Sequence, residues 1–433
     1  MRFYSLLFKH LFFFCLTGNI IIYTQGWFPQ SANTTNWHHS NYFVNSLTGY
    51  ISGEDGAIYK TTDGGSSWIL KQTGTSLGLY TLFFLKNINP SVGYAAGEYG
   101  TIIKTVNSGE NWSALTTPLD SSITSIFFID LNTGYSTSVL GKIIKTTNGG
   151  NNWSLLYTGV YNIVNTVFFT SIETGYAAGN NGLFLKTTNG GSSWINQTTN
   201  TKFYIRSLFF FNDNTGFAAG GRSREGGKIF KTTNGGVNWV FQDPGTFNHL
   251  LSICFVNMNT GFASGFAGTI IKTTNSGSSW FIQESGSINT LRSIFFTSSD
   301  TGYIAGSFGT ILKTTNAGEP IGITKINNKI PESFGLKQNY PNPFNPTTKI
   351  KFSLPLPSKG GVHDVKLIIY DILGREIASL IPPLPDFSWG GKVGLSPGNY
   401  EVEWDAGQFS SGLYFCNLRT TGYSKTIKMM LLK

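Results

Sequence analysis

The feature that most constrains this fold is a short motif that the chain repeats at nearly constant spacing. Its first copy is Thr-Thr-Asp-Gly-Gly-Ser-Ser-Trp, residues 61–68, and later copies end in Trp112, Trp153, Trp194, Trp239 and Trp280. The steps between successive tryptophans are 44, 41, 41, 45 and 41 residues. A period near 40 residues with short strands is typical of propeller blades rather than of helical arrays.

A second marker indicates how many units there are. Glycine followed by tyrosine or phenylalanine recurs at seven positions, Gly49, Gly93, Gly134, Gly175, Gly216, Gly261 and Gly302. The last motif copy, residues 314–321, ends in Ile321 instead of tryptophan, whereas Trp27 lies 41 residues before Trp68. We therefore expect the segment from Trp27 to supply the fourth strand of the last blade and to close a seven-bladed ring, which removes exposed sheet edges.

Each unit is expected to contain four short strands, with the motif between the third and the fourth. In the sixth unit these are residues 250–256, 261–265 and 269–273 and the stretch after Trp280. Asp or Asn in the motif can bond to its own backbone, glycine can adopt positive φ, and tryptophan can pin the outer strand. The residues given this structural role are Asp63, Trp68, Asn107, Trp112, Asn148, Trp153, Asn189, Trp194, Asn234, Trp239, Asn275, Trp280 and Asn316.

The composition fits a large β core and argues against nucleic-acid binding. Of 433 residues, 40% are hydrophobic and only 12% are charged, and 52 glycines suit many tight turns. The formal net charge is +9, but seven lysines occupy one repeat position and so do not form a basic stripe: Lys60, Lys104, Lys145, Lys186, Lys231, Lys272 and Lys313. Without an RNA-binding signature or a basic patch, we expect no nucleic-acid partner.

The first 26 residues predict a secretory signal. Arg2 and Lys9 precede apolar runs at 11–16 and 20–23, with cleavage expected near Gln25. An uncleaved anchor is the alternative, which the polar residues 17–19 disfavour. Cys254 and Cys416 then remain in the mature chain, which is not a disulfide framework. Cys254 replaces one phenylalanine of a recurring Phe-Phe pair and is expected to fill an apolar core slot. No metal site or cofactor is indicated.

The pattern Thr-x-Asp/Asn-x-Gly-x-x-Trp resembles the Asp-box, or BNR repeat. Together with Gly-Tyr-Ala-Ala-Gly and Ile-Ile-Lys-Thr-Thr, it is similar to the photosystem II stability/assembly factor family of seven-bladed propellers, over about residues 27–318. The resemblance implies an all-β propeller fold and says less about activity. It also implies an arginine patch on the propeller. The residues that we expect around the mouth of the central channel include only two arginines, Arg206 and Arg292. Because of this departure, a photosystem assembly role is kept only as a further alternative.

Asp-boxes also occur in sialidases and some glucan hydrolases, so a glycan-binding or glycoside hydrolase protein is an alternative. A sialidase-like site would require three convergent arginines, an acid and a Tyr/Glu pair in the central depression. No acidic pair stands out at matched spacing, and Glu54 and Asp55 are expected to form a solvated turn. The arginines available in the repeats are Arg206, Arg222, Arg224 and Arg292. We therefore expect no catalytic residues and no enzymatic activity.

Two insertions and one ring of residues give the candidate binding site. Blade two has three extra residues around 87–92, and blade five has four extra within 220–227. Because consecutive strands are antiparallel, the blade-five insertion is expected on the face opposite the Asp-boxes, where each first strand begins. Residues at that point should ring the mouth of the central channel: His39, Tyr80, Thr124, Asn165, Arg206, Leu251 and Arg292. The predicted partner-binding residues are His39, Tyr80, Arg206, Arg222, Arg224 and Arg292.

The composition changes after Gly318. Residues 319–335 are predicted to be a linker, and residues 336–433 to form an immunoglobulin-like antiparallel β-sandwich with alternating runs at 349–354, 365–370, 400–404, 413–418 and 426–432. An ordinary accessory sandwich is the alternative interpretation, which the five motifs given next disfavour. The proline-rich stretch 382–397 leaves the local strand assignment open.

Residues 331–433 resemble the type A C-terminal sorting domain of the type IX secretion system. The resemblance depends on Tyr-Pro-Asn-Pro-Phe-Asn-Pro at 340–346, Ile-Tyr-Asp-Ile-Leu-Gly-Arg-Glu at 369–376, Tyr-x-Val-x-Trp-Asp at 400–405, Ser-Gly-Leu-Tyr at 411–414 and the terminal run 428–433. It implies a sorting signal that includes Gly374, Gly412, Tyr414, Lys428 and Lys433. The sequence thus predicts a monomeric, secreted or cell-surface scaffold that binds a protein partner and passes through the periplasm to the type IX machinery.

Overall fold

The computed structural model describes residues 26–197, 201–222, 225–318, 323–327, 329–357, 363, 365–381, 395–406 and 409–433. Residues 1–25 of the predicted signal, Arg224 and Ile321 lie outside these residues. The regular secondary structure of the described chain is β, apart from two short 3-10 turns, η1 (Glu98–Gly100) and η2 (Asn180–Gly182), which confirms the all-β class. In this part of the chain no helix has the length and apolar character needed to cross a membrane.

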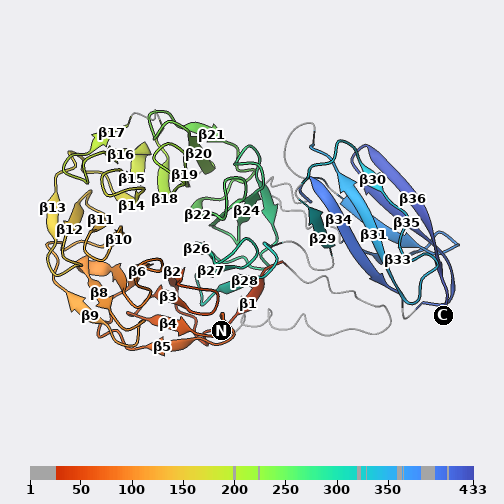
Figure 1. Ribbon diagram of the computed structural model, residues 1–433, viewed down its shortest axis with the longest axis horizontal. Helices are drawn as coiled ribbons and strands as arrows, with labels where there is room; N and C mark the ends of the chain where they lie inside the picture. Colours follow the sequence, from red (N-terminus) through yellow and green to blue (C-terminus); the bar gives the residue numbers. More distant parts are fainter. Residues whose placement is uncertain are drawn as a thin grey trace, which may run out of the picture.

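The described residues up to 318 form seven four-stranded sheets, which we call blades, around a common centre (Figure 1). Blade one contains β2 (His38–Phe43), β3 (Gly49–Gly53), β4 (Ile58–Thr61) and β5 (Ile69–Lys71). Blade two contains β6 (Leu79–Phe84), β7 (Gly93–Gly97), β8 (Ile102–Thr105) and β9 (Ser113–Leu115). Blade three contains β10 (Ile123–Phe128), β11 (Gly134–Ser138), β12 (Ile143–Thr146) and β13 (Ser154–Leu156).

The remaining blades repeat this order. Blade four contains β14 (Val164–Phe169), β15 (Gly175–Gly179), β16 (Phe184–Thr187) and β17 (Ile195–Asn196). Blade five contains β18 (Tyr204–Phe210), β19 (Gly216–Arg222), β20 (Gly226–Thr232) and β21 (Val240–Gln242). Blade six contains β22 (Leu250–Phe255), β23 (Gly261–Gly265), β24 (Ile270–Thr273) and β25 (Phe281–Gln283). Blade seven contains β26 (Leu291–Phe296), β27 (Gly302–Gly306), β28 (Ile311–Thr314) and, from the other end of the chain, β1 (Phe28–Gln30).

Stacked aromatic rings join neighbouring blades. In blades two and three, the second phenylalanine of the Phe-Phe pair stacks on the tyrosine of the preceding second strand, with Phe84 4.0 Å from Tyr50 and Phe128 3.8 Å from Tyr94 between ring centroids. The same phenylalanine explains the recurring glycine, because a Cβ at Gly93 would lie 2.3 Å from the Phe84 ring. The glycine therefore makes room for the phenylalanine of its own blade, and the tyrosine after it stacks on the phenylalanine of the next blade.

Each motif loop, the segment from threonine to tryptophan, is organised by its threonine and its Asp or Asn. In blade three, Gly150 N donates to Thr146 Oγ1 at 2.9 Å, and Asn152 N donates to Asn148 Oδ1 at 2.9 Å. The Trp153 ring meets Phe128 edge-on with centroids 5.9 Å apart. These local bonds satisfy backbone donors that the tight turn leaves outside the sheet.

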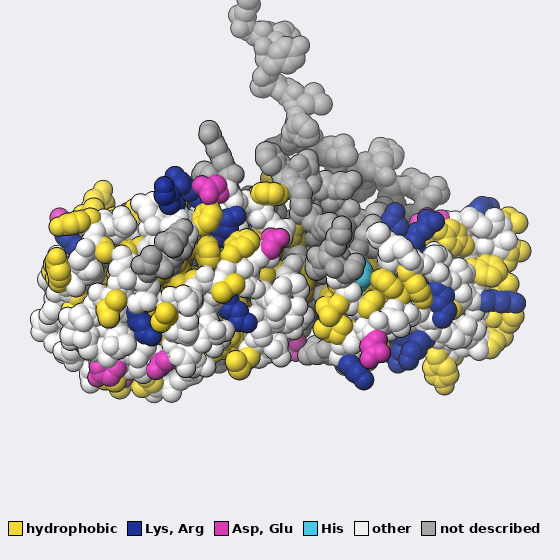
Figure 2. All heavy atoms as spheres, turned by 90° about the horizontal axis from the view of Figure 1, so that it is seen from above, with side chains coloured by type: hydrophobic (Ala, Val, Ile, Leu, Met, Phe, Trp, Pro, Cys, Tyr) yellow, Lys and Arg dark blue, Asp and Glu magenta, His cyan; other side chains and the backbone are white. Residues whose placement is uncertain are grey.

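The repeated lysines also tie one blade to the next. Lys104 Nζ and Tyr94 Oη both donate to the Gly149 carbonyl of the following motif loop, at 2.8 and 3.0 Å. Lys145 repeats the contact with the Gly190 carbonyl at 2.7 Å. These ammonium groups are hydrogen-bonded to the next blade, and on the side of the ring seen in Figure 2 lysine and arginine appear in small separate groups.

The N-terminal strand completes the ring of sheets. β1 pairs antiparallel with β28, with Phe28 opposite Lys313 and Gln30 opposite Ile311. Trp27 is fully buried, meets Phe296 edge-on at 5.9 Å, and donates from Nε1 to Gln283 Oε1 at 3.1 Å. Trp27 therefore occupies, in blade seven, the position that the motif tryptophan occupies in the other blades.

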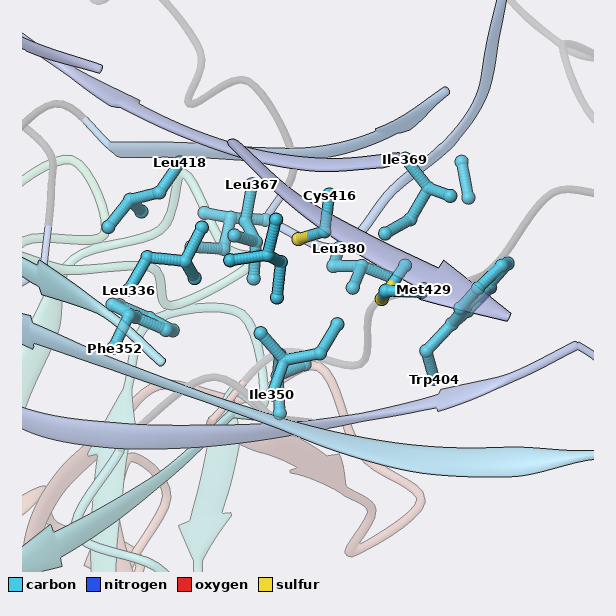
Figure 3. Close-up of a cluster of buried hydrophobic side chains, with 14 of the residues drawn as sticks. Leu336, Ile350, Phe352, Leu367, Ile369, Leu380, Trp404, Cys416, Leu418 and Met429 are labelled. Carbon is cyan, nitrogen blue, oxygen red and sulfur yellow. The ribbon is translucent and has the colours of Figure 1, made fainter. Parts of the chain in front are cut away.

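The C-terminal part forms two further four-stranded sheets. One has the order β29 (Ile323–Asn327), β34 (Gly398–Asp405), β31 (Thr347–Leu354) and β30 (Gly335–Leu336). The other has β33 (Glu376–Ser379), β32 (Val365–Tyr370), β35 (Gly412–Thr420) and β36 (Tyr423–Leu431). Side chains from both sheets, including Ile350, Phe352, Leu367, Trp404 and Met429, point toward one another in a shared core (Figure 3).

The linker prediction differs from the structure in one segment. Residues 323–327 lie within the predicted linker but form β29, which pairs with β34. The stability of a five-residue edge strand depends on pairing with its neighbour more than on its own hydrophobic pattern. The sequence of residues 323–327 alone therefore did not predict this strand.

The predicted sorting residues have defined places in these sheets. Gly374 has φ +75° in the turn after β32, and Gly412 is the first residue of β35. Tyr414 Oη donates to the Ser410 carbonyl at 2.7 Å, and Lys433 N donates to Ser411 Oγ at 2.9 Å. Lys428 lies in β36. These contacts fix the chain near the C-terminal strands and assign no activity to it.

Candidate binding site at the centre of the ring

The structure brings together three of the six predicted partner-binding residues. His39, Tyr80 and Arg292 lie near the start of the first strands of blades one, two and seven, which are neighbours in the ring. The His39 and Tyr80 rings are 4.9 Å apart and nearly perpendicular. The Arg292 guanidinium lies 4.8 Å above the ring of Trp37, the residue just before β2. We call these four residues, with the two glutamates described next, the mouth cluster.

Two glutamates of the mouth cluster were missed in the sequence. Glu98 accepts hydrogen bonds from Tyr80 Oη at 2.8 Å and from Gly78 N at 3.0 Å. Glu54 accepts one from Trp37 N at 3.2 Å and is partly buried, so the predicted solvated turn is wrong for this residue. The expectation that no acidic pair has matched spacing is also wrong, because each glutamate directly follows its second strand. Comparing the residues that follow these strands would have found both.

Burial of the titratable side chains in the mouth cluster is only partly offset by their polar neighbours, and it shifts their pKa values. Burial, with help from Arg292 and His38, lowers the pKa of His39 to about 4, against an opposing effect of Glu98. Burial and the hydrogen bond to Glu98 raise the pKa of Tyr80 to about 12. Burial also lowers the pKa of Arg292, against an opposing effect of Glu54, and its Nε has no hydrogen-bond partner among the described residues. At neutral pH the cluster thus combines a neutral histidine, a neutral tyrosine and an arginine cation beside the carboxyl groups of Glu54 and Glu98.

Arg206 lies in blade five, and its side chain is held by Asn165 of blade four rather than by residues of the mouth cluster. Its Nη1 donates to Asn165 Oδ1 at 3.1 Å, and Asn165 in turn donates to the Ile205 carbonyl at 2.8 Å and to Asn180 Oδ1 at 2.9 Å. Burial lowers the pKa of Arg206. Within the described residues neither Arg206 nor Arg292 forms an ion pair. Both guanidinium groups therefore keep anion-binding capacity.

The blade-five insertion lengthens its hairpin and is not joined to the mouth cluster by any described contact. Arg222 pairs across the hairpin with Gly226, and its Nη1 lies 3.5 Å from Glu225 Oε1. Both side chains are substantially exposed, so this ion pair contributes little to stability. Arg224 lies outside the described residues. The described part of the chain also contains no group of three His, Cys, Asp or Glu side chains that could hold a metal ion.

Comparison with known proteins defines the class of fold. Residues 22–160 match the family model described as photosynthesis system II assembly factor YCF48. No curated protein sequence matches the chain. The solved structure of YCF48 bound to D1 peptide is 19% identical, with a TM-score of 0.57, and the match covers 67% of this chain and 97% of that one.

Two other solved structures show the same likeness. YCF48 from Cyanidioschyzon merolae is 18% identical over 66% of this chain and 98% of its own, with a TM-score of 0.55. The WD40 β-propeller domain of Doa1 is 15% identical over 66% of this chain and 96% of its own, with a TM-score of 0.54. At these identities the likeness shows the fold, and the prediction of a propeller is confirmed. In particular, the chain is similar to YCF48-type propellers.

Proposed function

We propose that this chain is a non-catalytic propeller scaffold that binds an acidic segment of a protein partner at the mouth of the ring, through Arg292 of the mouth cluster and Arg206 of blade five. The observation that carries the proposal is that two guanidinium groups, Arg206 and Arg292, form no ion pair among the described residues, although Glu54 lies near enough to Arg292 to raise its pKa. A partner carboxylate would supply the missing charge-assisted hydrogen bonds, beside the aromatic surface of Trp37 and Tyr80. A similar structure, YCF48, was solved with a bound peptide, which supports a polypeptide ligand.

Changing Arg206 and Arg292 together to alanine should weaken capture of the native partner at least tenfold, because each lost charged hydrogen bond costs about 1.5–3 kcal/mol. Affinity capture from the native cell surface, followed by titration of the recovered partner, measures this. The matched control is Arg222→Ala with Arg224→Ala, which removes the same charge from the blade-five hairpin. Loss of capture in the control pair alone would place the site on that hairpin and contradict the proposal.

A second candidate function is glycan recognition or cleavage of the sialidase type. It is favoured by one observation, the hydrogen bond between Tyr80 and Glu98 beside Arg292. Such a site requires three convergent arginines, whereas the mouth cluster contains only Arg292. A glycan array combined with a hydrolysis assay on the wild-type chain and the Tyr80→Phe variant separates this candidate from protein binding.

We further propose that the ring functions as a closed seven-bladed propeller of a monomeric, secreted or cell-surface protein. The C-terminal sheets would be an immunoglobulin-like sandwich that addresses the chain to the type IX secretion machinery. The five sequence motifs between Tyr340 and Lys433 support this assignment. A photosystem assembly role is disfavoured, because an exported chain would be in the wrong compartment.

Deleting residues 319–433 should leave a folded ring in the periplasm, because the ring and the C-terminal sheets have separate hydrophobic cores. The cut precedes β29, since a cut at residue 331 would leave a strand of the C-terminal sheet behind. Immunoblots of periplasmic and extracellular fractions provide the readout, and circular dichroism checks the fold. Recovery of the truncated chain outside the cell at the parental level would contradict the sorting assignment.

A further inference from the structure

The turn between the second and third strands has, in every blade except blade five, an exposed tip residue followed by a glycine. In blades one, two, four, six and seven this residue and its glycine both have positive φ. Two successive left-handed residues are typical of a type I′ turn, which prefers Asn-Gly or Asp-Gly. Asp55 and Asn181 fit this preference. The tip residues are Asp55, Tyr99, Leu140, Asn181, Ala267 and Phe308.

Tyr99 and Phe308 depart from this preference. Their φ values are +49° and +56°, in a region of backbone conformation that large side chains rarely adopt. The two residues are 72% and 61% exposed, so most of each aromatic side chain lies in water. Neither the turn type nor the hydrophobic core therefore explains an aromatic residue at these two tips. Strained backbone of this kind is common at functional sites.

The two aromatic tips flank the mouth cluster. Phe308 belongs to blade seven and Tyr99 to blade two, the neighbours of blade one on either side (Figure 1). The Phe308 ring meets the Trp37 ring edge-on, with centroids 5.8 Å apart. Tyr99 directly follows Glu98, which accepts the hydrogen bond from Tyr80 Oη. A chain of neighbouring residues therefore leads from one aromatic tip through the mouth cluster to the other.

The charges between the two tips limit what a partner can carry. Arg292, 4.8 Å above the Trp37 ring, forms no ion pair among the described residues. Two carboxylates lie close by, because Glu54 accepts a hydrogen bond from Trp37 N and Asp55 accepts one from Asn36 Nδ2 at 2.9 Å. A run of acidic residues would be repelled by these carboxylates, whereas a single acidic residue can reach the guanidinium.

We propose that the partner segment bound at the mouth of the ring carries one acidic residue between two large apolar side chains. The acidic residue binds Arg292, and the apolar side chains contact Phe308 on one side and Tyr99 on the other. The acidic part rests on the proposed function, and the apolar part rests on the two aromatic tips. Contacts with exposed aromatic residues then supply most of the binding free energy, as at many protein interfaces.

Fluorescein-labelled nonapeptides with a central aspartate test this proposal on the full chain by fluorescence anisotropy. One peptide has serine at every flanking position, and the others have leucine on one or both sides, placed at each position in turn. The best peptide with two leucines should bind about tenfold more tightly than the all-serine peptide. Tyr99→Asn should remove the gain from leucine on one side, and Phe308→Asn the gain from leucine on the other, whereas Tyr99→Phe should retain it.

The same variants separate binding from folding. Asparagine accepts left-handed backbone and already occupies the tip of blade four, so both asparagine variants should keep or raise the thermal midpoint of unfolding. A lower midpoint in both would show that the aromatic tips support the fold, and would overturn the proposal. The matched control is Tyr161→Asn. Tyr161 is 95% exposed and lies against Gly141 of blade three, away from the mouth cluster.

Peptides with asparagine in place of the central aspartate test the acidic part separately. Equal binding of the two series would contradict the proposed function and leave the leucine preference standing. A preference for aspartate without any gain from leucine would overturn only the present proposal, as would loss of the leucine gain in the Tyr161→Asn control. Failure of every peptide to bind would contradict both, and loss of glycan-array binding in Tyr99→Asn would then identify a glycan as the occupant.

Discussion

Replacing Trp27 with alanine should lower the free energy of unfolding of the ring by about 3–5 kcal/mol, the usual cost of emptying a buried tryptophan site. Trp27 is fully buried against Phe296, and its indole N–H is bonded to Gln283. The change also loosens β1, the strand that covers β28. Urea unfolding followed by tryptophan fluorescence measures the loss, and deletion of residues 26–30 should additionally cause self-association through the bared edge.

Ile69→Ala is the control for this experiment. Ile69 lies on β5, the fourth strand of blade one, but 58% of its surface is exposed. Its truncation should change stability by no more than about 0.5 kcal/mol. If the Trp27→Ala and Ile69→Ala chains unfolded alike, the N-terminal strand would not contribute to the closure of the ring.

His38 should make the ring lose stability in acid. Its side chain is fully buried, both ring nitrogens lack partners in the described structure, and burial lowers its pKa from 6.5 to about 4. The unfolded chain therefore binds a proton more readily than the folded chain, so stability is fully present above about pH 6.5 and falls as the pH drops toward 4. The pKa difference corresponds to a loss of about 3 kcal/mol.

The His38→Leu variant should abolish this part of the pH dependence. Leucine suits the position, because the equivalent residues of the other blades are all fully buried and apolar: Leu79, Ile123, Val164, Ile205, Leu250 and Leu291. Unfolding free energies at pH 7.5, 5.5 and 4.0 give the comparison, with His249→Leu as a control at a partly exposed histidine. Equal pH dependence in wild type and His38→Leu would show that His38 is protonated without cost.

The repeats made the fold predictable from sequence, whereas the site was only partly predictable. The spacing of tryptophans and Gly-Tyr pairs reports contacts that recur in blade after blade, such as Phe84 on Tyr50, so each copy corroborates the others. β29 has no such repetition, and its pairing with β34 arises from a strand about 75 residues away in sequence.

The mouth cluster shows why function is harder to predict than fold. The equivalent-position argument placed His39, Tyr80 and Arg292 correctly on neighbouring first strands, but Glu54 and Glu98 come from other segments and reach the cluster through their side chains. Arg222 was chosen because its loop is unusual in sequence, yet its described partner is Glu225 in the same hairpin. A departure from the repeat marks a place of variation and does not specify which direction its side chains face.

The contacts of the motif loops have a consequence for engineering this scaffold. The Gly149 carbonyl accepts hydrogen bonds from both Lys104 and Tyr94 of the preceding blade, so altering one such loop disturbs two blades at once. Strands β19 and β20, by contrast, are each seven residues long where their counterparts have five and four, and the hairpin keeps its pairing register out to Arg222 and Gly226. New recognition segments should therefore be grafted at the turns between second and third strands, where an insertion is accommodated within a single blade.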